Sequence, residues 1–342
     1  MNQAKLQLYA DLIRYGLGMT VLKEIPFRVM EITPYRKNCF LIKTKKQLVF
    51  LWVHQGREEN LTAQISIMEH CRRHGFQGFF ELITLKSGRL YERLGEREWF
   101  YLTQGVELRK FSYRDREQLR SAVKLIADFH ISCNNWSLPP YLQGIQEKPN
   151  FIDKMTEIII NLNSFKMLAT TRISPTKFDR LILSKLPQLV QNAAEAVALL
   201  KDSNYLELFS EPKQRKIIIN DFDHSNLGFD SQANLYCRQL KKFRCELPLF
   251  DLGLFLLKSA RFHYWKSEWF EDLYEEYQKY IPISPAESVI LKAYLSFPWH
   301  LARLAYRYYF NLADWPLHFY IEKLERLLMV EERRMAFVSG LA

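Results

Sequence analysis

The pattern of apolar and polar positions changes near residue 105 of the chain. Up to that point, short apolar runs alternate with polar residues and are separated by basic turns, which predicts an antiparallel β-sheet. Beyond it, apolar residues recur at helical spacing over long segments, which predicts a mostly helical remainder. We therefore expect an α+β protein with a β-rich N-terminal lobe over residues 1–104 and a helical C-terminal lobe over residues 105–342.

The individual elements follow from the same pattern and from its glycine and proline breaks. Strands are expected at residues 21–25, 27–33, 38–43, 48–53, 79–85, 90–94 and 99–104. Helices are expected at residues 4–18, 58–74, 115–133, 151–165, 175–200, 269–280, 284–296, 298–311 and 316–336, with a loop over 134–150. The helix at 58–74 is the one expected to pack within the small lobe.

Residues 217–229 combine strand-like apolar runs with polar side chains that are candidates for catalysis or ligand binding. Three isoleucines lead into a polar loop and apolar residues follow, so we expect a strand, a tight loop and a second strand. Asp221 and Asn226 lie five residues apart on the loop, with Phe222 as an apolar anchor between them. Phosphotransferases place a carboxylate that orients the substrate hydroxyl and an amide that holds magnesium on one such loop.

The order Asp-aromatic-x-x-x-Asn after an apolar strand resembles the catalytic loop of the aminoglycoside phosphotransferase and choline kinase-like superfamily. The sequence Pro-Leu-Phe-Asp-Leu-Gly at residues 248–253 resembles the Pro-x-x-Asp-Leu segment of the same superfamily. Within it, the chain resembles the CotS/YutH family of endospore coat-associated proteins, and its YutH type in particular. Segments typical of that family occur in order at residues 100–107, 199–205, 296–300 and 307–311.

The resemblance implies a bilobal protein-kinase-like fold and assigns roles within it. Asp221 takes the place of the catalytic base, and Asn226, with Asp223 on the same loop, takes the place of the cofactor-binding residues. Asp251 would open a helix behind the active site as structural support. His130 would pack beneath the catalytic loop, a structural role that we favour over a chemical one.

Residues Gln104 and Val106 would lie in the hinge between the lobes, where a kinase binds adenine through backbone groups. A plain linker between domains is the alternative, and the sequence does not separate the two.

One departure from the family pattern concerns the strand at 48–53. Family members carry a lysine here that contacts the nucleotide phosphates, and our alignment places Trp52 at that position. An indole offers one neutral N–H and no charge. A slip of the alignment by one or two residues, with Lys43, Lys45 or Lys46 in the role, is the alternative.

A second departure concerns the magnesium-binding carboxylate expected nine residues before Pro248, where this chain has Gln239. A glutamine oxygen supplies no charge to offset a divalent ion, and Lys241 and Lys242 follow closely. No glycine-rich phosphate loop lies between the first strands. Because the loss of one key electrostatic group commonly costs roughly 100- to 1,000-fold in rate, these departures predict inefficient turnover.

Two histidines, His70 and His74, lie four residues apart on the helix at 58–74. This spacing places both rings on one helix face, which can bind a metal. No further ligand stands beside them, so we favour exposed residues at a helix end and expect no metal site.

Charge, aromatic content and cysteine content limit the classes of partner and the location that we expect. The net charge of +10 and the pI near 9.2 favour an anionic partner or simply a basic surface. Aromatic residues interleaved with Arg303 and Arg307 could stack nucleic-acid bases, but a packed helical lobe is the favoured interpretation, and nucleic acid is an unlikely partner. The five cysteines form no Cys-x-x-Cys pair, and we expect neither secretion nor a membrane span.

We therefore interpret the chain as a spore coat-associated protein with a degenerate kinase-like fold, a pseudokinase with other coat proteins as partners. It would reside in the mother-cell cytoplasm during sporulation and then in the coat, without a cofactor. The alternative is a phosphotransferase that uses ATP and Mg²⁺ on a small molecule or a coat protein. Asp221 would be its base, and Asn226 with Asp223 would be its metal ligands.

Overall fold

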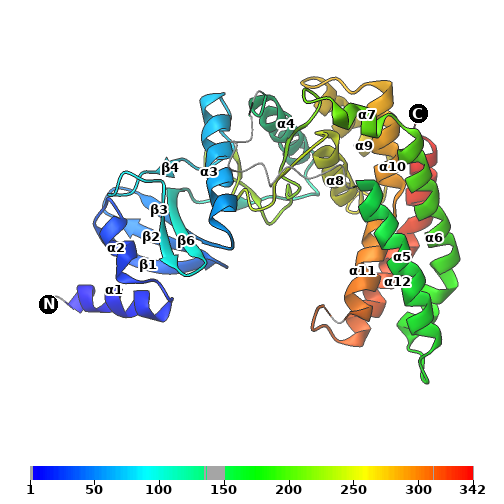
Figure 1. Ribbon diagram of the computed structural model, residues 1–342, viewed down its shortest axis with the longest axis horizontal. Helices are drawn as coiled ribbons and strands as arrows, with labels where there is room; N and C mark the ends of the chain where they lie inside the picture. Colours follow the sequence, from blue (N-terminus) through cyan, green and yellow to red (C-terminus); the bar gives the residue numbers. More distant parts are fainter. Residues whose placement is uncertain (1–2, 135, 137–150, 311, 342) are drawn as a thin grey trace. The chain divides into compact units, whose positions relative to one another are not determined.

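A computed structural model describes residues 3–134, 136, 151–310 and 312–341 of the chain (Figure 1). The chain forms two compact units. The first, called the sheet unit here, consists of Met1–Ser112, Asp128–Ile145 and Asp221–Phe243. The second, the helical unit, consists of Tyr113–Ala127, Gln146–Asn220 and Arg244–Ala342. Compactness thus groups the polar loop with the sheet, whereas the sequence pattern divides the chain once, after residue 104. The loop expected over 134–150 lies almost wholly outside the described residues.

Six strands of the sheet unit form one antiparallel sheet, as the alternating pattern predicts. They are β1 (Val29–Arg36), β2 (Cys39–Thr44), β3 (Leu48–Gln55), β4 (Leu82–Ile83), β5 (Tyr91–Gly95) and β6 (Glu98–Gly105). The order across the sheet is β1-β2-β3-β6-β4, and β5 also pairs with β6. In this register Trp52 of β3 lies opposite Cys39 of β2 on one side and Tyr101 of β6 on the other.

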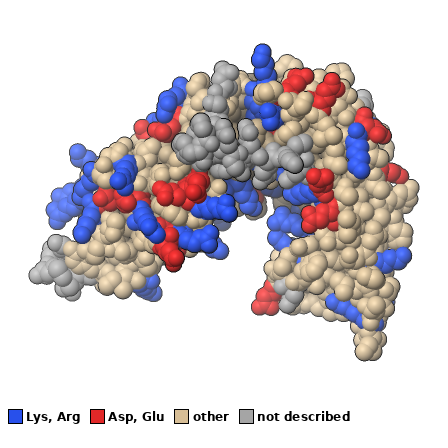
Figure 2. Space-filling view, in the orientation of Figure 1, with Lys and Arg blue, Asp and Glu red and all other residues tan. Residues whose placement is uncertain are grey.

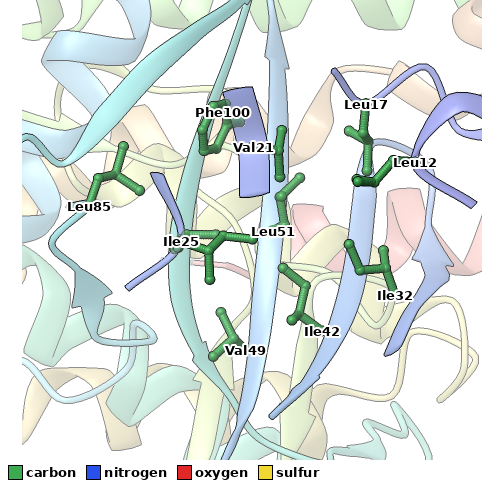
Figure 3. Close-up of a cluster of buried hydrophobic side chains, with 11 residues drawn as sticks. Leu12, Leu17, Val21, Ile25, Ile32, Ile42, Val49, Leu51, Leu85 and Phe100 are labelled. Carbon is green, nitrogen blue, oxygen red and sulfur yellow. The ribbon is translucent and has the colours of Figure 1, made fainter. Parts of the chain in front are cut away.

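The strand predicted at residues 21–25 is wrong, because this segment belongs to a helix. The chain begins with α1 (Gln3–Arg14) and continues with α2 (Met19–Glu24). Val21 and Ile25 are both fully buried and lie four residues apart, which is a helical spacing that a short apolar run does not distinguish from a strand. They pack with Leu51 and Phe100 in the core cluster shown in Figure 3.

A second core cluster forms between the sheet and α3 (Glu58–Arg73). Leu61 and Ile65 of that helix pack in one cluster with Phe50, Trp52 and Tyr101 of the sheet. The helix expected at residues 58–74 is confirmed, and its contact with the sheet is mostly apolar and aromatic.

The strand, loop and second strand predicted at residues 217–229 are confirmed. β8 (Lys216–Ile218) pairs with β11 (Arg244–Glu246), while β9 (Leu227–Phe229) pairs with β10 (Leu235–Cys237) and with β7 (Arg109–Lys110). The polar loop connects β8 to β9.

The remainder of the described chain is mostly helical, as predicted. Its helices are α4 (Arg116–Ser132), α5 (Phe151–Thr170), α6 (Lys177–Asp202), α7 (Tyr205–Ser210), α8 (Leu249–Ala260), α9 (Ser267–Gln278), α10 (Pro285–Ser296), α11 (Trp299–Tyr309) and α12 (Leu317–Ser339). Within the helical unit, α5 packs along α6, and α11 and α12 pack against this pair (Figure 1). Across the described part of the chain, no helix combines the length and apolarity needed to cross a membrane.

The aromatic residues of the C-terminal third lie largely within this packing. The Tyr308 ring lies 3.9 Å from the Phe178 ring, and the Tyr309 ring stacks on Phe165 at 4.9 Å between centroids. Arg307 lies over Trp315 at 5.3 Å. These contacts join α11 to α5 and α6, which agrees with the packed helical lobe favoured from the sequence.

Candidate functional site

The backbone that leads into the polar loop is held by Asp251. After β8 the chain passes through Asn220, which adopts a left-handed conformation with φ of 53°. Asn tolerates this conformation better than most residues. The Asp251 carboxylate, 1% exposed near the start of α8, accepts hydrogen bonds from the backbone N–H of Ile219 (2.8 Å) and of Asn220 (2.6 Å). A buried negative charge thus fixes the turn that precedes Asp221, a contact of the kind expected for structural support.

The next two residues, Asp221 and Phe222, differ in their exposure to solvent. Asp221 is partly exposed, and its negative charge acts on Lys241. Desolvation and the nearby Arg36 lower the pKa of Lys241, and the Asp221 carboxylate opposes that shift. Phe222 is buried and meets the ring of Phe129 edge-on at 6.1 Å, which fits the anchor role expected for it.

His130 follows Phe129 on α4. Its side chain is 1% exposed, and its ring lies 5.8 Å from the Phe129 ring. Because Phe129 also contacts Phe222, His130 packs next to the ring that anchors the polar loop, and its structural role stays a prediction.

Asp223 serves the local geometry of the loop. Its Oδ1 accepts hydrogen bonds from the Ser225 N–H (2.9 Å), the Ser225 hydroxyl (2.5 Å) and the Asn226 N–H (3.2 Å). This is an Asx turn, in which a short carboxylate replaces a backbone acceptor. Oδ1 is therefore engaged by three donors of the same loop.

The Asn226 side chain pairs with the main chain of Gln239. Its Nδ2 donates to the Gln239 carbonyl (2.8 Å), and its Oδ1 accepts from the Gln239 N–H (3.0 Å). Asn226 is 4% exposed, and Nδ2 also lies 3.3 Å from the Asp221 carbonyl. The amide oxygen that magnesium would require is thus used to hold the segment after β10.

The Gln239 side chain, at the residue where the resemblance expects the metal carboxylate, is 8% exposed. Magnesium takes near-octahedral oxygen ligands and usually at least one carboxylate. As arranged, Asn226 and Gln239 do not supply such a set, so these two residues do not fit the ion.

Trp52 lies within the second core cluster and is 1% exposed. Its indole Nε1–H donates to the Thr103 hydroxyl of β6 (3.0 Å), so its one polar atom is satisfied inside the sheet unit. On α3, Gln64 donates from Nε2 to the Tyr101 hydroxyl (2.8 Å). A neutral, hydrogen-bonded aromatic layer therefore surrounds Trp52, the residue at which the resemblance expects a lysine.

The two hinge candidates lie at the end of β6. The backbone N–H of Gln104 donates to the Glu81 carbonyl (2.8 Å), and its side-chain Nε2 donates to the Glu81 carboxylate (2.7 Å). Val106 packs against the second core cluster. Between them, a Cβ on Gly105 would lie 2.8 Å from the backbone of Leu48, so this close approach requires glycine. The Gln104 N–H is thus already engaged.

His70 and His74 stack on each other at the end of α3, with ring centroids 4.1 Å apart. The Nδ1 atom of His74 lies 2.8 Å from the His70 carbonyl, and the Nε2 atom of His70 lies 3.2 Å from the Asn134 carbonyl. Within the described ranges, no three His, Cys, Asp or Glu side chains are placed to hold a metal ion.

Sequence reasoning missed a group of cations beside the polar loop. Arg36, Arg238 and Lys241 all act electrostatically on Cys39, the residue opposite Trp52. Burial raises the pKa of the Cys39 thiol to about 12, and the three cations oppose that shift. A basic turn at 35–37 was visible in the sequence, but its meeting with residues 238–241 depends on the fold.

Comparisons with known proteins give the fold of the chain. No protein-family model matches it, and no curated protein does. An aminoglycoside phosphotransferase from Alicyclobacillus acidocaldarius is 18% identical with a TM-score of 0.85, over 95% of each chain. The spectinomycin phosphotransferase APH(9)-Ia, in complex with ADP and spectinomycin, is 14% identical with a TM-score of 0.62 over 98% of each chain.

A microcompartment-associated aminopropanol kinase is 12% identical with a TM-score of 0.66, over 97% of this chain and 99% of the other. At these identities the likeness shows the fold. The chain has the kinase-like fold of small-molecule phosphotransferases, as the polar loop and the strand and helix pattern predicted.

Proposed function

We propose that this protein is a pseudokinase, a kinase-fold protein without efficient phosphotransfer, which acts in the assembly or structure of the endospore coat. One observation supports the first part most strongly: the Asn226 amide is paired with the Gln239 main chain. Phosphotransfer of this class needs the loop amide and a nearby carboxylate to share magnesium. Here the amide holds the chain, and the carboxylate is replaced by a buried glutamine.

The Trp52 position supports the same proposal. A buried indole, hydrogen-bonded to Thr103, supplies no charge to a nucleotide phosphate. Because phosphoryl transfer depends on positioning and charge neutralisation, losses at two such positions combine to several orders of magnitude in rate. Under this proposal the protein needs neither ATP nor Mg²⁺.

The role in the coat rests on the sequence resemblance to the CotS/YutH family. It places the protein in the mother-cell cytoplasm during sporulation and then in the coat, with other coat proteins as partners. Nucleic acid is not among the expected partners.

The alternative is a phosphotransferase that uses ATP and Mg²⁺ on a small molecule or a coat protein. Asp221 on its loop favours it, as do the names of the structural neighbours, which are phosphotransferases and a kinase. In this case Asp221 would act as base, Asn226 and Asp223 would be the metal ligands, and the Asn226 Oδ1 would have to leave its hydrogen bond with the Gln239 N–H.

A nucleotide titration separates the two. A ligand at 100 times its Kd stabilises a protein by about 2.7 kcal/mol, which raises Tm by roughly 2–4 °C for a chain of this size. We expect no magnesium-dependent rise in Tm with ATP, and no ADP release above the level of an Asp221→Asn variant. A magnesium-dependent rise with turnover that Asp221→Asn abolishes would favour the enzyme.

A gain-of-function variant tests the alignment itself. Gln239→Asp restores a carboxylate at the expected metal position, and we expect magnesium-dependent stabilisation by ATP to increase. The matched control is Gln232→Asp, which adds the same charge at an exposed turn of the sheet unit. If both variants respond alike, position 239 is not the metal position.

The coat role is tested in a sporulating host. A fluorescent fusion should collect around the forespore during sporulation. After the spores are purified and decoated, the fusion should be found in the coat extract. A fusion that stays dispersed in the mother cell, or that is found in vegetative cells only, contradicts the coat assignment while leaving the pseudokinase proposal untouched.

A further inference from the structure

The cations beside the polar loop come from separate parts of the sheet unit. Arg36 ends β1, Arg238 follows β10, and Lys241 lies three residues further along. Each of them acts on the Cys39 thiol, so all three lie close to one position of β2. On the face shown in Figure 2, Lys and Arg side chains gather over the sheet unit, with Asp and Glu among them.

Two of these three cationic side chains, Arg36 and Arg238, have a buried N–H donor without a hydrogen-bond partner. Arg36 donates from Nη2 to the Ser225 carbonyl of the polar loop (2.7 Å), but its Nη1 is buried and has no hydrogen-bond partner. The Nη1 of Arg238 is likewise buried without a partner. Buried polar groups are normally hydrogen-bonded, so these two donors are available to an added acceptor.

The backbone leaves room for Arg238 by means of a glycine. A Cβ at Gly228 would clash with Arg238 Nη2 and would lie 2.9 Å from its Cζ. The Arg238 N–H also donates to the Asn226 carbonyl (2.7 Å), which fixes the start of the side chain. The guanidinium thus lies against Gly228 of β9, the strand that follows the polar loop.

The group is electrostatically uncompensated within the described chain. No ion pair within 4.0 Å joins Arg36, Arg238 or Lys241 to a described carboxylate. The carboxylate that acts on Lys241 is that of Asp221, which opposes the lowering of the Lys241 pKa. Burial lowers the pKa of Arg238, and Arg36 adds to that shift. Three positive charges with one partial counter-charge favour an added anion.

We propose that Arg36, Arg238 and Lys241 form a binding site for the phosphate group of a small phosphorylated molecule, held directly and without a divalent metal. Guanidinium forks match the geometry of phosphate oxygens, and the lysine adds a point charge. The site lies at Cys39, across the strand pair from Trp52, so fixed cations of the chain supply the charge that a metal and a strand lysine would otherwise supply.

The orphaned donors favour a terminal phosphate over a nucleic-acid backbone. Both Nη1 atoms are buried, whereas the Arg36 and Arg238 side chains are only partly buried as a whole. A small anion that enters between them with a slight rotation of each guanidinium can reach these donors, and a duplex cannot.

Calorimetric titration with pyrophosphate, inorganic phosphate, ATP and adenosine tests the site, each in EDTA and in excess Mg²⁺ at constant ionic strength. We expect at least one phosphate compound to bind in EDTA, adenosine not to bind, and Mg²⁺ to weaken binding because it neutralises the anion. Equal affinity for pyrophosphate and ATP identifies phosphate alone as the ligand; tighter binding of ATP adds a contact to the nucleoside.

Single substitutions locate the binding. Arg36→Ala and Lys241→Ala should each weaken binding about tenfold or more, as expected for charge-assisted hydrogen bonds. Lys241 is exposed, so its variant keeps the fold, which circular dichroism and Tm verify. The matched control, Lys23→Ala, removes the same charge from an exposed position of α2 in the sheet unit and should change affinity less than twofold.

Three outcomes overturn the inference: no phosphate compound binds in EDTA, binding requires Mg²⁺, or Lys23→Ala weakens binding as much as Lys241→Ala. The pseudokinase proposal fails on a separate readout, because it requires only the absence of efficient turnover. Metal-free binding together with turnover would refute that proposal and leave the phosphate site in place.

Discussion

The two ends of the polar loop are held by different chemistry. At its start, the Asp251 carboxylate accepts the N–H groups of Ile219 and Asn220. At its far end, the Asn226 amide both donates to and accepts from the main chain of Gln239. A carboxylate only accepts, so it suits a turn that presents two donors, whereas an amide suits an N–H and a C=O of one residue.

The two contacts differ in the atoms that they engage. The contact at the start shapes the turn before Asp221 and does not use a group expected to bind a metal. The contact at the far end uses the amide oxygen that would otherwise face a metal. Under the pseudokinase proposal, the loop keeps its shape and its sequence signature while the amide that would bind a metal becomes part of the scaffold.

The largest effect is expected from Asp251→Ala. Removal of the buried carboxylate leaves two backbone donors without acceptors, and we expect a loss of about 3–5 kcal/mol in the free energy of unfolding. Urea denaturation measures it. Asp202→Ala, at an exposed position of α6, is the matched control and should stay within about 0.5 kcal/mol of the wild type. Equal effects of the two would show that Asp251 does not hold the loop.

Asn226→Ala should follow, with a loss of about 2–3 kcal/mol, because the N–H and C=O of Gln239 both lose their partner. Urea denaturation again measures it, against Asn163→Ala on the exposed face of α5. Wild-type stability in Asn226→Ala would remove the main support for the pseudokinase proposal, since the amide would then be available to a metal.

Trp52→Phe should cost about 1–2 kcal/mol, because it loses the bond to Thr103 and part of the buried ring. A double-mutant cycle with Thr103→Val isolates the hydrogen bond. We expect a favourable coupling between the two positions. Additive effects would mean that the indole N–H contributes nothing and that Trp52 acts by volume alone.

Asp223→Ala should have the smallest effect, about 1 kcal/mol or less, because the Asx turn is partly exposed. Hydrogen exchange is the sensitive measurement: the amides of Ser225 and Asn226 should exchange faster while the rest of the sheet unit is unchanged. A global loss of protection would place Asp223 with Asp251 as a support of the fold.

Local pattern was sufficient for most of the architecture. Alternation predicted the antiparallel sheet, and the sequence from Ile217 to Phe229 predicted a strand, a loop and a strand. The segment at Val21 failed because two buried residues four apart satisfy a short strand and a helix equally well, and only the packing of α2 on the sheet decides between them.

By itself, the sequence determined which side chains are present: a loop with Asp221 and Asn226, a tryptophan where a lysine was expected, and a glutamine where a carboxylate was expected. Only the tertiary structure decided what these groups contact. Asn226 meets a residue 13 positions away, and Arg36 meets the loop across 189 positions. Hydrogen bonds and charge interactions act over a few ångströms in space, and separation along the chain does not encode that distance.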